Sequence, residues 1–198
     1  MRILLPATLI VLLVLVALSP LYAQETKEWE FFGGYSLQRT QVREYFKSTP
    51  SIYSIKNRLE TLNGWEFSVT ENMNHWFGGT FDVSGHYKTP TLQGSPNQER
   101  MHSFMYGPRF SLHTPYVTPF AHVLFGAAIS NVQVTPVGPH ASNTSFAAAA
   151  GGGVDLNLGQ TISVRLLQAE YVHADALGAS QNNYRASAGV VFRVGKTK

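Results

Sequence analysis

Three residue types that can support hydrolysis stand at alternate positions in one short stretch. Asp82, Ser84 and His86 are two residues apart, so in an extended strand they share one face. A serine next to a histidine that a carboxylate orients is a nucleophile with its general base, which on lipid would release fatty acid. Alternate residues on one strand are ~7 Å apart, too far for direct contact. We therefore interpret them as a hydrogen-bonded filling and assign no catalytic residue.

Other site chemistries find little support. The chain has no cysteine, which excludes disulfides, thiol catalysis and cysteine-ligated metals. Its seven histidines show no spacing typical of metal ligands, and the glycines at 151–153 lack the Lys-Ser/Thr of a phosphate loop. The net charge is +3, and removal of Arg2 with the N-terminal segment leaves about +2, which is too small and too dispersed for a nucleic-acid partner. We expect no metal site, no cofactor and no nucleic acid.

Residue patterns predict strands and turns. Residues 182–195 alternate apolar with polar or small side chains, and residues 29–38 show the same alternation. A last strand leaves unpaired amides on a sheet edge unless it pairs with the first. These two stretches therefore predict the seam of a closed barrel.

Eight strands of about ten residues each, the length of a tilted bilayer crossing, can be read along the chain. They span residues 29–38, 62–71, 75–87, 101–112, 117–130, 146–158, 161–173 and 182–195. Ala147–Ala150 favour a helix, but the glycines that follow favour a strand. A change of phase between Leu166 and Leu167 predicts a bulge, and Pro108 predicts a bulge or a local distortion. Long and short connections alternate, so with the N-terminus on the periplasmic side all short turns fall inside and all long loops outside, which is the asymmetry of outer-membrane barrels.

The N-terminal segment differs from the rest. Residues 1–23 form an apolar run behind Met1 and Arg2 that ends at Ala23, before the polar Gln24. This is typical of a secretory signal peptide, with a retained anchor as the alternative. Residues 24–198 are then the barrel domain.

Aromatic residues at the strand ends predict which face meets lipid. Two interfacial girdles are expected of a membrane barrel and have no purpose in a soluble one. The predicted girdle residues are Trp29, Trp65, Trp76, Tyr87, Tyr106, Tyr116, Tyr171, Tyr184 and Phe192. None of the lysines (Lys27, Lys47, Lys56, Lys88, Lys196 and Lys198) falls inside a predicted strand. Together these features predict an eight-stranded antiparallel up-and-down transmembrane β-barrel of the all-β class.

Charges within the predicted strands are nearly balanced. A narrow lumen filled by carboxylate and guanidinium pairs explains this balance, because unpaired charge there is costly. The predicted lumen charge network comprises Glu30, Glu66, Asp82, Arg109, Asp155, Arg165, Glu170, Arg185 and Arg193.

Four segments carry a family resemblance. They are GGYS at 33–36, GPRF at 107–110, residues 149–172, and NNYRASAGVVFRVG at 182–195. In these the chain resembles the small eight-stranded outer-membrane barrels related to the OmpA transmembrane domain and OmpX, in porin-like single-domain form. The resemblance implies a non-enzymatic monomer in the outer membrane of a Gram-negative bacterium, exported by its signal peptide and inserted by the barrel-assembly machinery. No peptidoglycan-binding domain follows, and Phe192 replaces the usual terminal Phe as the candidate assembly signal.

The expected first loop, residues 39–61, is basic. Five cations (Arg39, Arg43, Lys47, Lys56 and Arg58) outnumber Glu44 and Glu60. They could meet lipopolysaccharide phosphates by Coulomb attraction, or the loop could simply be solvated. A structural or surface-interaction role is the leading hypothesis. A small-solute pore, a lipid-modifying enzyme using Ser84 and His86, and a soluble lipocalin-type carrier remain alternatives.

Overall fold

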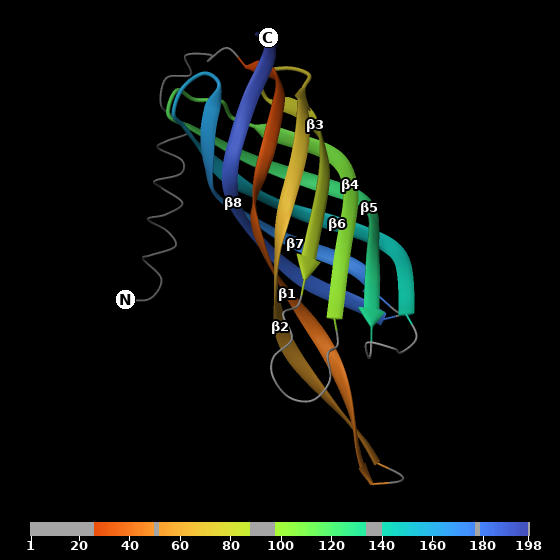
Figure 1. The fold of residues 1–198 in the computed structure, drawn as a ribbon. Coiled ribbons are helices and arrows are strands. Elements are labelled where there is room, and N and C mark those ends of the chain that lie inside the picture. The colour runs from red at the N-terminus through yellow and green to blue at the C-terminus, as the bar shows by residue number, and fades with distance from the viewer. Residues whose placement is uncertain (1–25, 50–51, 88–97, 134–139, 177–178, 198) are drawn as a thin grey trace, which may run out of the picture.

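The chain forms a closed barrel in which each strand pairs antiparallel with its sequence neighbours and the first pairs with the last (Figure 1). The computed structural model describes residues 26–49, 52–87, 98–133, 140–176 and 179–197. The strands are β1 (Lys27–Thr49), β2 (Ile52–Asn72), β3 (Phe77–Tyr87), β4 (Gln98–Ser111), β5 (Val117–Gln133), β6 (His140–Asn157), β7 (Ile162–Ala176) and β8 (Ala179–Thr197). The predicted fold class is confirmed, while the expected signal peptide at 1–23 lies outside the described residues. Within those residues, no helix is long and apolar enough to cross a membrane.

The seam between β1 and β8 depends on glycine. Tyr35 pairs with Ala188, and Gly34 pairs with Gly189. A Cβ at Gly189 would lie 2.3 Å from the Gly33 carbonyl oxygen and 2.5 Å from the Gly34 Cα. Any larger residue would push the two strands apart, so the closest approach of the seam requires glycine here.

Side chains alternate between the two faces of the barrel wall. On β8, Val190, Phe192 and Val194 are 37%, 49% and 45% exposed, whereas Val191 and Arg193 between them are 0% and 5% exposed. The predicted assignment of the apolar face to the outside is confirmed. In a membrane this outer face meets hydrocarbon.

All strands except β3 are longer than predicted at the end opposite the short turns. The prediction of a first loop spanning residues 39–61 is wrong. β1 continues to Thr49 and β2 begins at Ile52, and Glu44 and Lys56 are strand partners between them. Figure 1 shows this hairpin continuing beyond the other strands. The stretch is rich in Val, Ile, Thr, Tyr and Phe, which favour strands without any lipid-facing alternation.

Longer strands also overturn the expectation about lysine. Lys27, Lys47, Lys56 and Lys196 all lie within strands. They occupy the end segments of β1, β2 and β8 that extend past the predicted boundaries. Within the predicted boundaries the strands still carry no lysine, which fits an apolar outer face near the bilayer centre.

Local irregularities follow the sequence in part. The register of β7 shifts at Leu166 and Leu167, which are 52% and 53% exposed, so the predicted bulge is confirmed. No register shift occurs at Pro108, but the ladder with β5 lacks pairs at Gly107 and Pro108, which is the predicted local distortion. The ambiguous stretch predicted at 146–158 is strand as far as Asn157, within β6.

We expect arginine on the outer face to cost stability according to its depth. Val190 lies midway along the apolar face of β8, whereas Val194 shares that face near Lys196 at the strand end. Val190→Arg should lower the free energy of unfolding by about 2–4 kcal/mol and Val194→Arg by about 0–1 kcal/mol. Urea unfolding in lipid vesicles, checked by gel mobility in SDS without boiling, measures both. Equal losses would contradict the assigned depths of Val190 and Val194, and no loss in Val190→Arg would contradict its assignment to the lipid-facing side.

Candidate functional site

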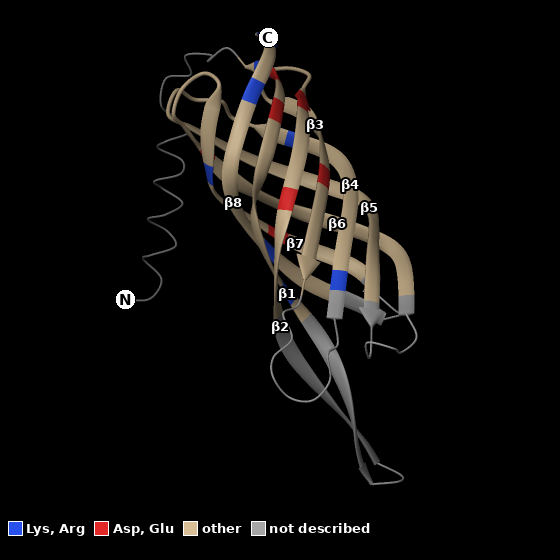
Figure 2. Ribbon diagram, in the orientation of Figure 1, with Lys and Arg blue, Asp and Glu red and all other residues tan. Residues whose placement is uncertain are grey.

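The barrel interior holds all of the charged residues predicted for it. Each of the nine is between 0% and 5% exposed. They come from every strand except β5: Glu30, Glu66, Asp82, Arg109, Asp155, Arg165, Glu170, Arg185 and Arg193. Figure 2 shows acidic and basic positions on strands around the barrel. The site is therefore a lumen in which ionisable groups from opposite walls can meet.

Arg185 joins three carboxylates across the lumen. Its Nε lies 2.5 Å from the Glu170 Oε2, and its Nη2 lies 2.9 Å from the Asp82 Oδ1. The Nε is also 3.5 Å from the Glu66 Oε2, and Nη1 donates to the Ser84 hydroxyl at 2.8 Å. Because β2 and β3 are not neighbours of β8, these contacts cross the interior rather than run along the wall.

A glutamine connects this cluster to a second one. Gln168 donates from Nε2 to the Glu66 Oε1 at 2.5 Å and accepts from the Arg165 Nη1 at 2.6 Å. Arg165 in turn pairs with Asp155 through its Nε at 2.8 Å. Gln168 was not among the predicted lumen residues, because its inward position depends on the β7 bulge.

Glu30 is the centre of the second cluster, near the short-turn end. It pairs with the Arg109 Nη2 at 3.2 Å and with the Arg193 Nε at 3.2 Å. Arg109 Nη2 also lies 3.5 Å from the Asp155 Oδ2, and the His113 Nε2 lies 3.2 Å from the Glu30 Oε1. In this cluster, carboxylates from β1 and β6 thus meet guanidinium groups from β4 and β8.

Two buried aromatic rings support the guanidinium groups. The Arg165 Cζ lies 4.1 Å from the centre of the Phe32 ring and 4.3 Å from that of Phe120, and the Arg109 Cζ lies 4.0 Å from the Phe120 ring. A cation over an aromatic face gains electrostatic attraction when it is away from water. Phe32 falls at the inward phase of its strand, which was the available sequence signal for this role.

Asp82, Ser84 and His86 are not joined to one another in the way that a hydrolytic site needs. Asp82 pairs with Arg185, Ser84 bonds to the Ser103 hydroxyl at 2.7 Å, and the His86 Nε2 lies 2.9 Å from the Ser36 Oγ. All three side chains are 1% exposed. They belong to the hydrogen-bonded filling of the lumen.

Part of the interior is apolar, which the sequence analysis did not anticipate. A cluster of buried residues lies on β4 to β7, with Leu124 0% and Met105 1% exposed. Its members are Met101, Met105, Leu124, Ala128, Ala147, Ala149, Val172 and Ala174. Methionines on β4 and mostly small residues on β5 to β7 thus fill this sector of the lumen without charge.

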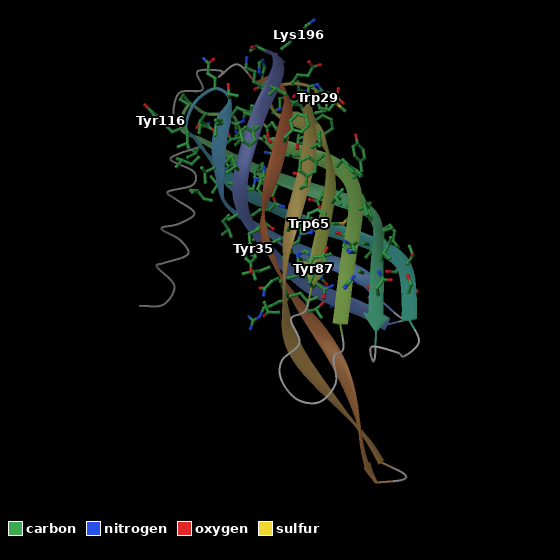
Figure 3. The ribbon with its side chains drawn as sticks, in the orientation of Figure 1. Trp29, Tyr35, Trp65, Tyr87, Tyr116 and Lys196 are labelled. Atoms are coloured by element: carbon green, nitrogen blue, oxygen red, sulfur yellow. The ribbon has the colours of Figure 1, made fainter. Side chains whose placement is uncertain are left out.

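Most of the residues predicted for the aromatic girdles point outward from the strands, while Trp76 and Tyr116 lie in the short turns before β3 and β5. Trp29 is half-buried, and the others are 38–78% exposed: Trp65, Trp76, Tyr87, Tyr106, Tyr116, Tyr171, Tyr184 and Phe192. Figure 3 shows Trp29 and Tyr116 toward the short-turn end, and Tyr35, Trp65 and Tyr87 together toward the β1–β2 hairpin. Tyr35, which the sequence analysis left out, donates its hydroxyl to the Asn63 Oδ1 at 2.9 Å.

No metal site emerges where the structure describes the chain: its residues contain no group of three or more His, Cys, Asp or Glu able to hold an ion. The carboxylates of the lumen are instead held by arginine. Chemically, the described interior provides closely paired charges, hydroxyl groups and packed apolar side chains.

Solved structures of low sequence identity share this architecture. Neisserial surface protein A (NspA) is 12% identical with a TM-score of 0.62, and the match covers 86% of this chain and all of that one (100%). Ail, the attachment invasion locus protein of Yersinia pestis, is 15% identical with a TM-score of 0.53, covering 84% of this chain and 99% of that one. A second Ail structure, in complex with the heparin analogue sucrose octasulfate, has the same TM-score of 0.53 at 16% identity, covering 84% and 99%. No curated protein sequence matches this chain.

One family model accounts for nearly the whole chain. The model described as "Outer membrane protein beta-barrel domain" matches residues 8–192. The match includes the lumen charges as far as Arg185 and almost all of the seam between β1 and β8. The chain therefore belongs to the outer membrane protein β-barrel domain family.

Proposed function

We propose that this protein is a non-enzymatic integral outer-membrane barrel with a closed lumen and a structural or surface-interaction role. Residues 1–23 direct its export, and residues 24–198 form a monomeric barrel inserted by the barrel-assembly machinery. Phe192, 49% exposed on the last strand, is available on the outer face as the assembly signal. Family membership and the resemblance of the chain to small eight-stranded barrels support this proposal.

The observation that carries the proposal is the contact of Arg185 with carboxylates from three other strands. Glu66, Asp82 and Glu170 lie on β2, β3 and β7, so this one guanidinium spans the interior. An eight-stranded barrel is only wide enough for side chains to fill. A filled interior supports a surface role over diffusion of solutes.

The energetics favour keeping this network intact. Each buried ion loses its hydration, and the loss is offset only where good geometry and further hydrogen bonds accompany the ion pair. Arg185 meets this condition, because Glu170 contacts it through both carboxylate oxygens, at 2.5 and 2.9 Å, and Ser84 accepts a further hydrogen bond. Moving Arg185 aside would leave three carboxylates without it, so the closed arrangement is strongly preferred.

The surface role falls to the end bearing the β1–β2 hairpin. Its five cations (Arg39, Arg43, Lys47, Lys56 and Arg58) suit the phosphates of lipopolysaccharide. Arg39 is exposed, while the side chains of the other four lie outside the described part. We assign outer-membrane lipid and lipopolysaccharide as the partners of this end, and no nucleic acid.

Removing the central guanidinium should destabilise the barrel. Arg185→Met leaves the surrounding carboxylates buried without their cation, and we expect a loss of about 3–5 kcal/mol in the free energy of unfolding. The exposed Arg100→Met is the matched control and should change it by less than about 1 kcal/mol. Adding Asp82→Asn and Glu170→Gln to Arg185→Met should recover part of the loss. Equal effects of Arg185→Met and Arg100→Met in urea unfolding would refute the role of the network.

Planar-bilayer recording tests the closed lumen directly. Protein whose folding is established by its faster gel mobility in SDS before boiling should give no stepwise currents, because side chains occupy the interior. Stepwise currents that change in Arg165→Ala or Glu66→Ala would instead identify a small-solute pore lined by the network.

A further inference from the structure

The outer face carries a second cluster of polar and aromatic groups near the β1–β2 hairpin. Two successive rows of outward residues run across β1 to β4 in register. The first row is Tyr35, Trp65, Gly85 and His102, and the second is Leu37, Asn63, Tyr87 and Arg100. We call these residues, together with Arg39, the rim patch. Figure 3 shows its labelled members Tyr35, Trp65 and Tyr87 close together.

The Trp65 indole lies against the barrel wall in the middle of the rim patch. A Cβ on Gly85 would lie only 2.9–3.0 Å from the indole atoms Cε2, Nε1 and Cζ2, so the ring rests directly against the glycine backbone. The indole nevertheless remains 42% exposed. An aromatic ring supported on one side and open on the other offers a flat surface for the C–H face of a sugar or another apolar group.

Polar groups surround this ring. The Trp65 Nε1 lies 3.4 Å from the Tyr87 hydroxyl, and the Tyr35 hydroxyl donates to Asn63 at 2.9 Å. Tyr87 also meets the His102 ring edge-on, with centroids 5.6 Å apart. Hydroxyl, amide and imidazole groups around an aromatic ring suit a ligand with many hydroxyls better than a purely apolar one.

Cations stand at the two ends of the rim patch. Arg100 lies at the β4 side, where its strand partner on β3 is Tyr87. Arg39 lies at the β8 side, where its strand partner is Tyr184. Both arginines are exposed. Glu71 is the outward acidic residue in the described part of β1 to β4. It lies toward the short turns, where its strand partner is Trp29. Guanidinium groups at such positions suit phosphate.

We infer that the rim patch binds the phosphorylated sugar headgroup of an outer-leaflet lipid, with one sugar face on Trp65 and phosphates at Arg39 and Arg100. The occupant is a lipid because the rim patch continues the apolar outer face, on which Phe67, Phe81 and Phe104 are 42–44% exposed. The inference rests on the proposed outer-membrane role and extends it from the hairpin to a site on the barrel wall. The test of this inference does not depend on conductance, so the lipid site and the proposed closed lumen can each be refuted without the other.

Trp65 can report its own occupancy. The chain has three tryptophans, so Trp29→Phe with Trp76→Phe leaves Trp65 as the single tryptophan, whose emission can be excited selectively over that of the tyrosines. We expect lipid A, a bis-phosphorylated glucosamine disaccharide lipid, to change Trp65 emission in detergent-solubilised full-length protein at a concentration about tenfold below that needed for phosphatidylglycerol. Arg39→Gln with Arg100→Gln should weaken the lipid A response about tenfold or more.

The matched control removes two cations from the opposite end of the barrel. Lys27→Gln with Lys196→Gln changes the net charge equally and should leave the response to lipid A intact. Equal responses to lipid A and phosphatidylglycerol, or equal weakening by both charge pairs, would overturn the inference in favour of general attraction to anions. A response to soluble glucosamine 1-phosphate without one to lipid A, or cross-linking of two copies through the rim patch, would also overturn it.

Discussion

Backbone hydrogen bonding is the constraint on which the rest of this structure depends. In hydrocarbon no water can satisfy a free amide or carbonyl, so a sheet that crosses a bilayer must close on itself. Here closure joins β1 to β8 from Lys27–Thr197 to Arg39–Tyr184, with glycines at the closest approach. Once the sheet is closed, alternate side chains must face lipid or a narrow interior. At the depth of the hydrocarbon, polar side chains can only occupy the interior, and there they must satisfy one another.

The interior solves this packing problem in two different ways. Toward Glu30 and Arg185 it uses ion pairs that cross between non-adjacent strands, and two phenylalanine rings fill the space around Arg165. Beside them, on β4 to β7, it uses methionine, leucine, valine and alanine. Small residues on β6 make both possible. A Cβ on Gly153 would lie 2.8 Å from the Phe120 Cζ, so a larger residue would displace the ring that supports both arginines.

The alternation of the sequence predicted the closed barrel, its lipid-facing side and the inward position of the charged residues, because the bilayer imposes that pattern. It did not predict where the strands end. Beyond the bilayer a hairpin needs only backbone pairing, as between Glu44 and Lys56, and no pattern of side chains marks its limits. Nor did it predict which charges meet. Arg109 on β4 contacts Glu30 on β1 and Asp155 on β6, and such partners depend on the tilt and stagger of the whole barrel. The role of Gln168 depends further on the register shift at the β7 bulge.

The outer face is not uniform around the barrel, and this affects which lipids surround each side of it. Among the residues whose side chains the structure describes, the outward positions on β5 to β7 carry no Asp, Glu, Lys or Arg and include several small residues, such as Ala121 and Ala150. Outward cations at the hairpin end stand instead on β1 and β4, at Arg39 and Arg100. Headgroup phosphates attract such cations within about a Debye length, whereas the apolar outward side chains of β5 to β7 make dispersion contacts with acyl chains. Lipids of different headgroup chemistry should therefore distribute unevenly around the barrel, with phosphate-rich ones on the β1 to β4 side.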